Sequence, residues 1–546
     1  MNMQIHQDKQ NDYSRFLTWG IVILIVLFTS AIRVRLLDIP LERDEGEFAY
    51  MGQLIFQGIP PYLFAYSMKL PGIYAAYALI MAVFGQTPSG IHLGFLFINA
   101  LTIVVVFLLT RRLFDSYAGV IAGATYGILS VSPTVLGVCA HATHFVLLPA
   151  LGGILLMLGA IDTGKPNYMF WSGLLLGLAF LMKQSGIFFI IFAWLYLFRA
   201  QFQTQPVPWK RFVKQSILLL VGAVIPFCLA CLLLFRVGVF DKFWFWTFTY
   251  ASEYASEQSL SSGLLTFLLM AKKISGPSYL LWLLAGIGLS APLWDEKGRV
   301  QIFFIESFLI FSFLAICPGL YFRNHYFVLL LPAVALLTGL AVTSAQRLFL
   351  KFNGKVTMQW IPILALLLAF SHSVYNQKDF FFELPPCQAS RSMYITIQPF
   401  CESLEIAGYI KARTSKDDKI AVLGSEPQIY FYADRLSATG YIYTYGLMEN
   451  QRYALQMQRE MIRQIEAAQP KYLVFVKIPK SWVVRPDSER LIFNWFDKYR
   501  QNYYDLAGII DIIPSSQTVY RWEDEVRGYS PQSTNVVYVF KRKFAT

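Results

Sequence analysis

The chain reads LTWGIVILIVLFTSAI at residues 17–32, and shortly afterwards RDEGEF at residues 43–48. The first stretch carries no charge and, with its flanks at 16–36, is long enough to cross a bilayer once. The second places four charges within five residues. Ionisable groups at membrane depth are costly unless they are paired or face a water-filled cavity, so this cluster indicates a functional site at the membrane rim.

The composition is that of an integral membrane protein. Hydrophobic residues make up 56% of the chain and charged residues only 15%, and the mean hydropathy is +0.47. A soluble globule could not bury so much apolar surface. No basic stripe interleaved with aromatics lies outside the apolar stretches, so the net charge of +12 does not indicate nucleic acid.

Apolar stretches along the chain predict about eleven transmembrane helices. They lie near 16–36, 91–110, 117–137, 144–161, 168–182, 185–198, 214–235, 276–294, 301–318, 326–344 and 358–376. No small-residue cleavage pattern follows the first stretch, and its polar leader carries Lys9 and Arg15, so the amino terminus is expected in the cytoplasm of a multi-pass protein of the plasma or inner membrane. Arg33 and Arg35 oppose the positive-inside rule, and we interpret them as snorkelling to the outer headgroups, with a substrate role as the alternative.

An odd number of crossings puts the polar remainder of the chain outside the cytoplasm. We therefore expect a transmembrane domain at 1–376 and an extracytoplasmic α/β domain at 377–546, in a mainly α-helical protein. Residues 402–413 and 450–468 have helical patterns, and 419–423 and 472–476 look like short buried strands. An oxidising exterior permits a disulfide between Cys387 and Cys401, although the sequence does not decide whether they pair.

The first outer loop, residues 37–90, is patterned rather than a simple connector. Apolar residues recur there at helical spacing, at Phe48, Met51 and Ile55 and again at Leu70, Ile73, Tyr77 and Met81. These runs predict two amphipathic helices on the outer membrane surface. Acids at a helix amino terminus are also good caps, so capping is the structural alternative for Asp44 and Glu47.

The motifs of this loop resemble a known family. They are Arg-Asp-Glu-Gly-Glu-Phe-Ala-Tyr at 43–50, Met-Lys-Leu-Pro-Gly at 68–72, and Arg-Arg-Leu-Phe at 111–114, where the second span ends. The chain is similar here to the polyprenyl-phosphate-sugar-dependent glycosyltransferases of the C-type fold, which include protein O-mannosyltransferases and lipid A aminoarabinose transferases. The resemblance implies an inverting glycosyltransferase that moves a sugar from a polyprenyl monophosphate to an acceptor hydroxyl on the extracytoplasmic side.

The resemblance also implies roles for individual residues. Asp44 matches the family's acid after the first span and is the candidate base, and Glu45 is a second acid or an acceptor-orienting group. Lys69 matches the lysine that meets the lipid phosphate, although Leu70 here separates it from Pro71. Phosphate contacts are also expected from Arg323, His325 and Lys183, for which anchoring at the membrane interface is the alternative. The substrate cavity is expected to hold Tyr50, Tyr66, His141, His144, Gln184 and Tyr326.

His141 and His144 are spaced so that one helical turn would put both on one face. A divalent metal site there would need a third ligand that the spacing does not supply. We therefore expect these histidines to form hydrogen bonds to sugar or phosphate in the cavity, with a divalent metal as the alternative, and no cofactor is required. The expected partners are a polyprenyl-phosphate sugar, membrane lipid, and an acceptor that is a glycolipid, a protein or a wall polymer. A transporter or flippase of a lipid-linked substrate is the rival function, and a non-catalytic assembly protein is a third.

Overall fold

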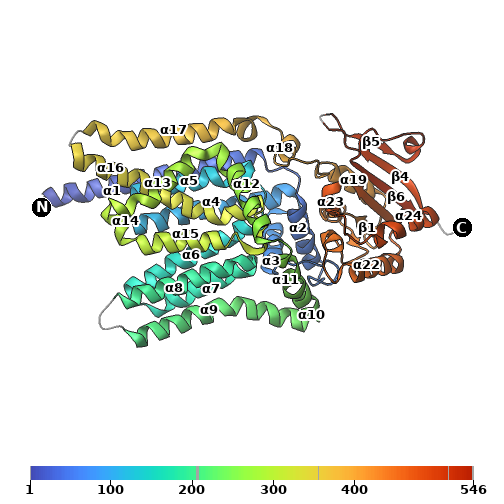
Figure 1. Cartoon of the computed structure of the whole chain (residues 1–546), viewed down its shortest axis with the longest axis horizontal. Coiled ribbons are helices and arrows are strands. Elements are labelled where there is room, and N and C mark those ends of the chain that lie inside the picture. The colour runs from blue at the N-terminus through green and yellow to red at the C-terminus, as the bar shows by residue number, and fades with distance from the viewer. Residues whose placement is uncertain (1, 204–207, 354–355, 515, 544–546) are drawn as a thin grey trace. The chain divides into compact units, whose positions relative to one another are not determined.

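A computed structural model describes residues 2–203, 208–353, 356–514 and 516–543 (Figure 1). Internal contacts divide the chain into two compact units. Unit 1 comprises residues 1–37, 92–230 and 258–384, and unit 2 comprises residues 38–91, 231–257 and 385–546. The first predicted outer loop thus groups with the carboxy-terminal region. The functional division at 376/377 stays a prediction.

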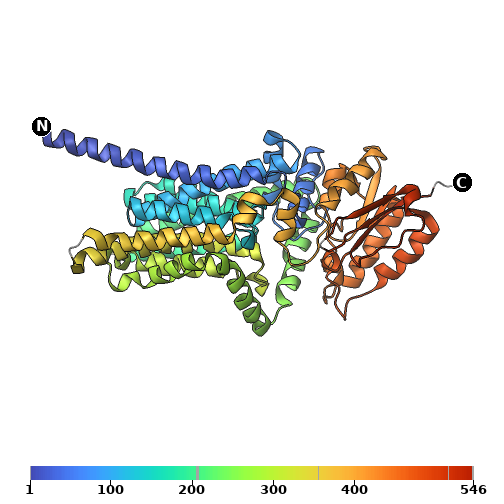
Figure 2. The same ribbon diagram turned by 90° about the horizontal axis from the view of Figure 1, so that it is seen from above.

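Unit 1 is a bundle of helices built from the apolar stretches. Unit 1 contains all or most of α1 (Asn2–Arg35), α4 (Pro88–Leu113), α5 (Ser116–Ser130), α6 (Ala142–Thr163), α7 (Pro166–Met182), α8 (Ile187–Phe202), α9 (Trp209–Arg236), α12 (Leu260–Ser275), α13 (Tyr279–Ser290), α14 (Glu296–Val300), α15 (Ile302–Leu314), α16 (Leu331–Asn353) and α17 (Ile361–Asn376). Most of the long helices run along a common direction (Figure 2). The long apolar stretches of these helices are typical of a membrane bundle.

Eight helical stretches among the described residues are long and apolar enough to cross a membrane. They are Arg15–Arg35, Pro88–Leu113, Ala142–Thr163, Gln184–Phe202, Trp209–Arg236, Leu260–Leu293, Asn324–Lys351 and Met358–Asn376. The stretch predicted at 276–294 is therefore the second half of a longer run. The other three predicted spans fall in the shorter helices α5, α7 and α15, of 15, 17 and 13 residues. The count of eleven crossings stays a prediction.

Two arginines at the end of α1 bind protein groups. Arg33 is only 4% exposed, and its guanidinium donates to Asn99 Oδ1 at 3.2 Å and to the Ser130 carbonyl at 3.1 Å. The expectation that Arg33 snorkels to the headgroups was wrong, because its guanidinium is buried in the bundle and its N–H groups donate to these oxygens. Arg35 donates to the carbonyls of Phe380, Phe381 and Leu384, so it fixes the chain after α17 to α1.

Unit 2 is an α/β assembly of three chain segments. Its helices are α2 (Arg43–Phe56), α3 (Gly72–Phe84), α10 (Phe240–Trp244), the π-helix η3 (Phe245–Tyr250), α11 (Ala251–Ser256), α18 (Pro386–Ser392), α19 (Glu402–Ala412), α20 (Gln428–Ala433), α21 (Tyr445–Met448), α22 (Ala454–Ala468), α23 (Pro479–Trp482) and α24 (Leu491–Tyr503). Its strands are β1 (Lys419–Leu423), β2 (Leu436–Ser437), β3 (Tyr472–Lys477), β4 (Tyr504–Asp511), β5 (Val519–Trp522) and β6 (Val536–Arg542).

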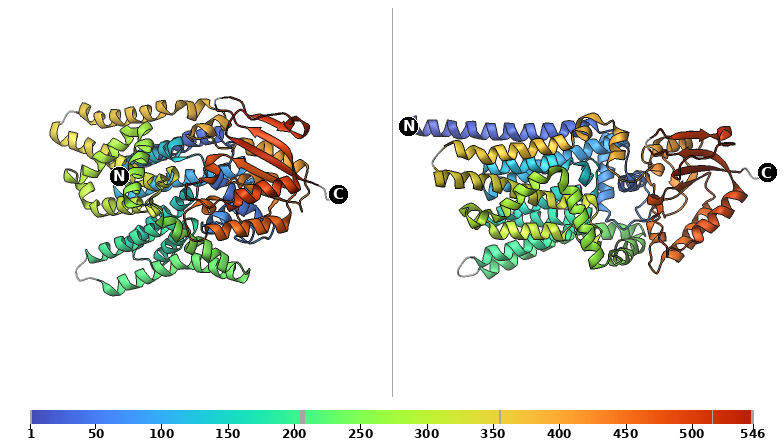
Figure 3. Two further views of the ribbon diagram at one scale, coloured as in Figure 1. Left: turned by 45° about the vertical axis from the view of Figure 1, so that its right-hand side comes forward. Right: turned by 45° about the horizontal axis from the view of Figure 1, so that its top comes forward.

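The six strands form one mixed sheet in the order β2-β1-β3-β6-β4-β5. The first three run parallel, with Ile420 opposite Tyr472, and the remaining pairings are antiparallel. Apolar residues of α22 and α24, such as Met461 and Phe496, share a core with Leu473 and Phe540 of the sheet. These two helices lie together on one side of the strands (Figure 3). The predicted strands at 419–423 and 472–476 and the helices at 402–413 and 450–468 are confirmed, with small shifts at their ends.

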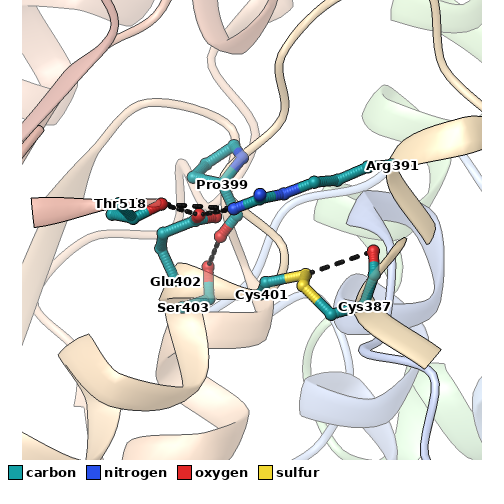
Figure 4. Close-up of a disulfide and its surroundings, with 7 residues drawn as sticks. All are labelled: Cys387, Arg391, Pro399, Cys401, Glu402, Ser403 and Thr518. Carbon is teal, nitrogen blue, oxygen red and sulfur yellow. Dashed lines mark hydrogen bonds and ion pairs between the residues drawn. A yellow bond between two sulfur atoms is a disulfide. The ribbon is translucent and has the colours of Figure 1, made fainter. Parts of the chain in front are cut away.

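Cys387 and Cys401 form a disulfide that ties the start of α18 to the residue before α19 (Figure 4). Beside it, Arg391 of α18 pairs with the buried Glu402 of α19, whose carboxylate also accepts a hydrogen bond from Thr518 Oγ1 at 2.7 Å. A covalent and an ionic link therefore hold the same two helices together.

Candidate active site

The charged motif of the first outer loop forms the first turn of α2. Glu42 is the N-cap: its carboxylate accepts from the amide of Glu45 at 3.0 Å, and the Glu45 carboxylate accepts from the amide of Glu42 at 3.2 Å. This reciprocal capping box stabilises the helix start. The capping acids are thus Glu42 and Glu45, and Glu45 is fully buried. The alternative that Asp44 and Glu47 act as caps does not describe this helix.

Asp44 points to polar partners within unit 2. Its Oδ1 accepts a hydrogen bond from the Tyr443 hydroxyl at 3.2 Å and lies 3.8 Å from Lys69 Nζ. The side chains of Asp44 and Lys69 are 14% and 21% exposed. Burial and the neighbouring charge of Asp44 raise the pKa of Tyr443, so this hydroxyl stays a proton donor. The structure therefore brings the predicted base and the predicted phosphate-binding lysine together.

Lys69 is held by its backbone. The Tyr62 hydroxyl donates to the Lys69 carbonyl at 2.7 Å, and the Lys69 amide donates to Ser67 Oγ at 3.1 Å. Its ammonium lies 5.6 Å from the ring centre of Phe48 on α2. Although Leu70 intervenes before Pro71, these contacts keep the lysine beside the start of α2.

Glu47, one turn beyond Asp44, is a further member of this cluster. It is 3% exposed, and its Oε1 accepts from the Tyr74 hydroxyl at 3.4 Å. Burial raises the pKa of Glu47 to about 7; Lys69 opposes this rise and the charge of Asp44 adds to it. Glu47 was not among the predicted site residues, although its i, i+3 spacing from Asp44 places both on one helix face. Tyr443 is far away in sequence, so no local signal could have found it.

The first residue of the motif, Arg43, anchors α2 within unit 2. It pairs with the fully buried Glu426 and donates to Tyr445 Oη and Gln398 Oε1, each at 3.0 Å. Gly46 permits the same packing, because a Cβ there would lie 2.6 Å from the backbone nitrogen of Gln428 on α20. The motif thus combines a partly exposed candidate base, Asp44, with residues that fix the helix, Arg43 and Gly46.

The two predicted cavity tyrosines have different surroundings. Tyr50 is fully buried: its hydroxyl accepts from the Ser437 amide at 2.8 Å, and its ring packs on Tyr430 at 5.3 Å. These contacts belong to the core of unit 2. Tyr66 instead lines a cavity with Lys242 and Glu460.

A second set of predicted residues meets in unit 1. The rings of His141 and His325 stack with centroids 4.0 Å apart, and His325 contacts Tyr326 at 4.9 Å. Lys183 Nζ lies 3.7 Å from the centre of the Tyr326 ring. Gln184 follows Lys183 in the break between α7 and α8. This stretch of ring contacts connects residues from three distant parts of the sequence.

Arg323 and His144 lie beside this set with contacts of their own. Arg323 is exposed and stands over Tyr321 at 5.3 Å. His144 packs edge-on against Phe95 at 4.7 Å. The histidines close enough to share an ion are therefore His141 and His325, each with a ring nitrogen within 4.8 Å of the other. Neutral imidazoles in such a pair suit a divalent metal.

Comparisons with known proteins agree with this architecture. No curated protein sequence matches the chain. Among solved structures, ArnT from Cupriavidus metallidurans bound to undecaprenyl phosphate has a TM-score of 0.56 at 14% identity, covering 95% of this chain and 98% of that one. The oligosaccharyltransferase AglB from Archaeoglobus fulgidus, in complex with an inhibitory peptide and a dolichol-phosphate, has a TM-score of 0.52 at 13% identity, covering 94% and 75%. A complex of the A. fulgidus oligosaccharyltransferase with Zn and sulfate has a TM-score of 0.54 at 14% identity, covering 92% and 72%.

A family match points the same way. Residues 69–235 match the dolichyl-phosphate-mannose-protein mannosyltransferase family. This segment includes Lys69 and the predicted site residues His141, His144, Lys183 and Gln184, and it ends near the end of α9. Residues 69–235 are therefore similar to the dolichyl-phosphate-mannose-protein mannosyltransferase family, and the fold of the chain is similar to those of ArnT and AglB.

Proposed function

We propose that the protein is an inverting glycosyltransferase that moves a sugar from a polyprenyl monophosphate to an acceptor hydroxyl on the extracytoplasmic side of the membrane. The observation that carries the proposal is the cluster of Asp44, Lys69 and Glu47 in unit 2. The solved relatives bind undecaprenyl phosphate or dolichol-phosphate, which supports a polyprenyl phosphate as carrier.

Asp44 is the general base in this mechanism. Its carboxylate takes the proton of the acceptor hydroxyl while that oxygen attacks the anomeric carbon, and the bond from this carbon to the phosphate oxygen breaks on the opposite face. The configuration inverts and the polyprenyl phosphate leaves with the bonding electron pair. Lys69 balances the negative charge that develops on the phosphate. Because Glu45 is buried in the capping box, we propose that it positions Asp44 by stabilising the first turn of α2.

The cations of unit 1 are proposed as phosphate ligands of the same reaction. Arg323 offers a planar fork for phosphate oxygens, and Lys183 and His325 offer further donors. His141, Gln184 and Tyr326 would line the cavity around them, as would His144. A divalent ion, if bound by His141 and His325, would add positive charge for the leaving phosphate.

The proposed topology has eleven crossings, with α5, α7 and α15 crossing in addition to the eight longer stretches. The odd number sends the chain after α17 to the exterior, so that unit 2 lies outside and α2 and α3 face the membrane surface. The disulfide between Cys387 and Cys401 supports this placement, because disulfides persist in oxidising compartments.

The test is release of polyprenyl phosphate by the purified protein in lipid nanodiscs, with a panel of polyprenyl-phosphate sugars and membrane acceptors. Asp44→Asn should lower transfer by about 10²–10⁴-fold, the usual contribution of a general base. Asp497→Asn, which alters an exposed acid of unit 2 paired with Arg500, is the matched control. If no donor turns over while labelled lipid crosses the bilayer in proteoliposomes, the flippase alternative replaces the enzyme.

A further inference from the structure

Unit 2 contains a cavity of about 310 Å³ that the proposed chemistry does not use. Its lining comes from the first loop (Tyr66), from α10 and η3 (Asp241, Lys242, Phe245 and Trp246), and from the carboxy-terminal region (Tyr441, Tyr453 and, on α22, Gln456, Met457 and Glu460). This volume is in the range of small-molecule sites, which are mostly apolar with a few fixed polar groups. All of its lining residues belong to unit 2.

Aromatic rings form the walls of the cavity. Tyr66 and Trp246 stack with centroids 5.1 Å apart, and Tyr441 meets both rings edge-on at 5.1 and 5.7 Å. At the other side Tyr453 packs edge-on against Phe245 at 5.1 Å. Rings in mutual contact form a rigid aromatic wall, and the partly exposed rings of Phe245 and Tyr453 can contact a ligand.

The backbone is shaped to bring these rings together. A Cβ at Gly440 would lie 2.3 Å from the Tyr66 ring, so only glycine permits this approach, and the Tyr66 amide donates to the Gly440 carbonyl at 2.6 Å. Trp246 lies in the π-helix Phe245–Tyr250. Such widened turns are rare and occur frequently at functional sites.

A partly buried hydrogen-bond network fixes the polar groups. Glu460 accepts from the Tyr441 hydroxyl at 2.9 Å and from the Tyr66 hydroxyl at 3.2 Å. Burial, together with the charge of Glu460, raises the pKa of Tyr66 to about 12, so its hydroxyl stays a donor. Lys242 Nζ stands 5.2 Å from the centre of the Tyr66 ring.

The mouth of the cavity offers further polar groups. Asp241 and Gln456 are exposed lining residues and make no hydrogen bond or ion pair within the described ranges. A second hollow of about 320 Å³ shares Asp241 and Phe245 with the first and is lined by the exposed Trp244. Two adjoining hollows with aromatic faces therefore share one carboxylate.

The chemistry of this lining selects a class of ligand. A free cation would be drawn to the ring faces, but Lys242 already stands over Tyr66. A phosphate would be repelled by the negatively charged carboxylates of Asp241 and Glu460. A neutral saccharide suits both features, because its C–H faces pack on rings while its hydroxyls bond to acids, amides and an ammonium.

We propose that this cavity binds a neutral saccharide of the acceptor, with the second hollow receiving the adjoining sugar. The proposal rests on the proposed function and names its acceptor class as a glycan or glycolipid. Tyr66 precedes Lys69 by three residues, which span at most about 10 Å of chain, so a bound acceptor would lie near the candidate base and phosphate site of the same unit.

The experiment is saturation-transfer NMR on the full-length protein in lipid nanodiscs, because detergents with sugar headgroups would compete. The probes are glucose, galactose, N-acetylglucosamine and their β-linked disaccharides, with choline as a cationic probe. We expect saturation of the saccharides and tighter binding of a disaccharide than of its monosaccharide. Failure of every saccharide to bind, or binding of choline alone, would overturn the proposal.

Variants locate the binding. Gln456→Ala and Asp241→Asn should each weaken disaccharide binding about tenfold, the effect of one lost hydrogen bond. Arg459→Ala is the matched control, since Arg459 is exposed on α22 but does not line the cavity. Unchanged melting temperatures separate lost contacts from misfolding, and full affinity in both folded variants would refute the site.

Donor turnover is measured on the same samples, so the two proposals fail separately. Turnover of a polyprenyl-phosphate sugar without saccharide binding would refute the acceptor site and leave the transferase standing. Saccharide binding without turnover of any donor would leave a sugar-binding site in a protein that is not this transferase.

Discussion

Replacing Glu47 by glutamine tests the electrostatics of the candidate site. Burial raises the pKa of this carboxyl from its ordinary value of 4.5 to about 7 in the folded protein. Since one pKa unit corresponds to about 1.4 kcal/mol, ionising Glu47 in the native state costs about 3 kcal/mol of stability.

The sign of the effect follows from proton binding. Below about pH 4.5 the carboxyl holds its proton in both the native and the unfolded state, so its ionisation does not change the free energy of unfolding. Between about pH 4.5 and 7 the unfolded chain loses the proton while the native state keeps it, so stability falls as pH rises. Above about pH 7 both states are ionised and the full loss remains. Glu47→Gln lacks this loss, so its advantage over wild type should grow by about 3 kcal/mol from pH 4.5 to 8.

The assay is thermal unfolding followed by tryptophan fluorescence at pH 4.5, 6, 7 and 8. For a cooperative unit of this size, about 3 kcal/mol corresponds to roughly 6–12 °C in melting temperature. Glu525→Gln removes an exposed carboxylate of unit 2 and is the control. A difference between Glu47→Gln and wild type that stays constant across this pH range would refute the reasoning, because Glu47 would then ionise like a solvated acid.

Three further predictions concern stability, each measured by unfolding of the full chain. Gly46→Ala should cost about 1–3 kcal/mol, since its Cβ would lie 2.6 Å from the backbone of α20, whereas Gly408→Ala in α19 meets nothing within 4 Å and should be neutral or stabilising; equal effects would contradict this packing. Cys387→Ser should cost about 3 kcal/mol, and a reductant should lower wild type to the level of the variant without changing the variant. Glu426→Gln should cost about 3–5 kcal/mol, because it leaves the charge of Arg43 buried without its partner; a loss below about 1 kcal/mol would count against a buried pair.

Local patterns predicted the elements well. Hydropathy located the long helices of unit 1 except α12, and apolar runs located β1 and β3, because a buried strand or span must be apolar whatever it packs against. The charged motif at 43–48 drew attention to Asp44, and the resemblance of the motifs at 43–50 and 68–72 to a known family gave the predicted roles of Asp44 and Lys69. It did not separate their roles from that of Glu45, since helix capping and catalysis use the same kind of residue and only burial distinguishes them.

Contacts between distant segments could not be predicted from local sequence patterns. The hydroxyl of Tyr443 reaches Asp44, and His325 rather than His144 stacks on His141. Each pairing joins residues far apart in the chain, and no single sequence records which distant segment a side chain will meet. The grouping of the first loop with the carboxy-terminal sheet escaped prediction for the same reason.

The discontinuous make-up of unit 2 has a consequence for synthesis. The helix α2 packs closely on α20, through the contact of Gly46 with Gln428, yet some 370 residues separate the two helices in the chain. At about 5–20 residues per second, the ribosome needs roughly 20–80 s to make that interval. During this time the nascent α2 carries Tyr50, whose ring packs on Tyr430 of α20, without the partner that will cover it. A chain that terminates before α20 therefore cannot complete this unit. The exposed apolar surface of its α2 would be recognised by chaperones and proteases.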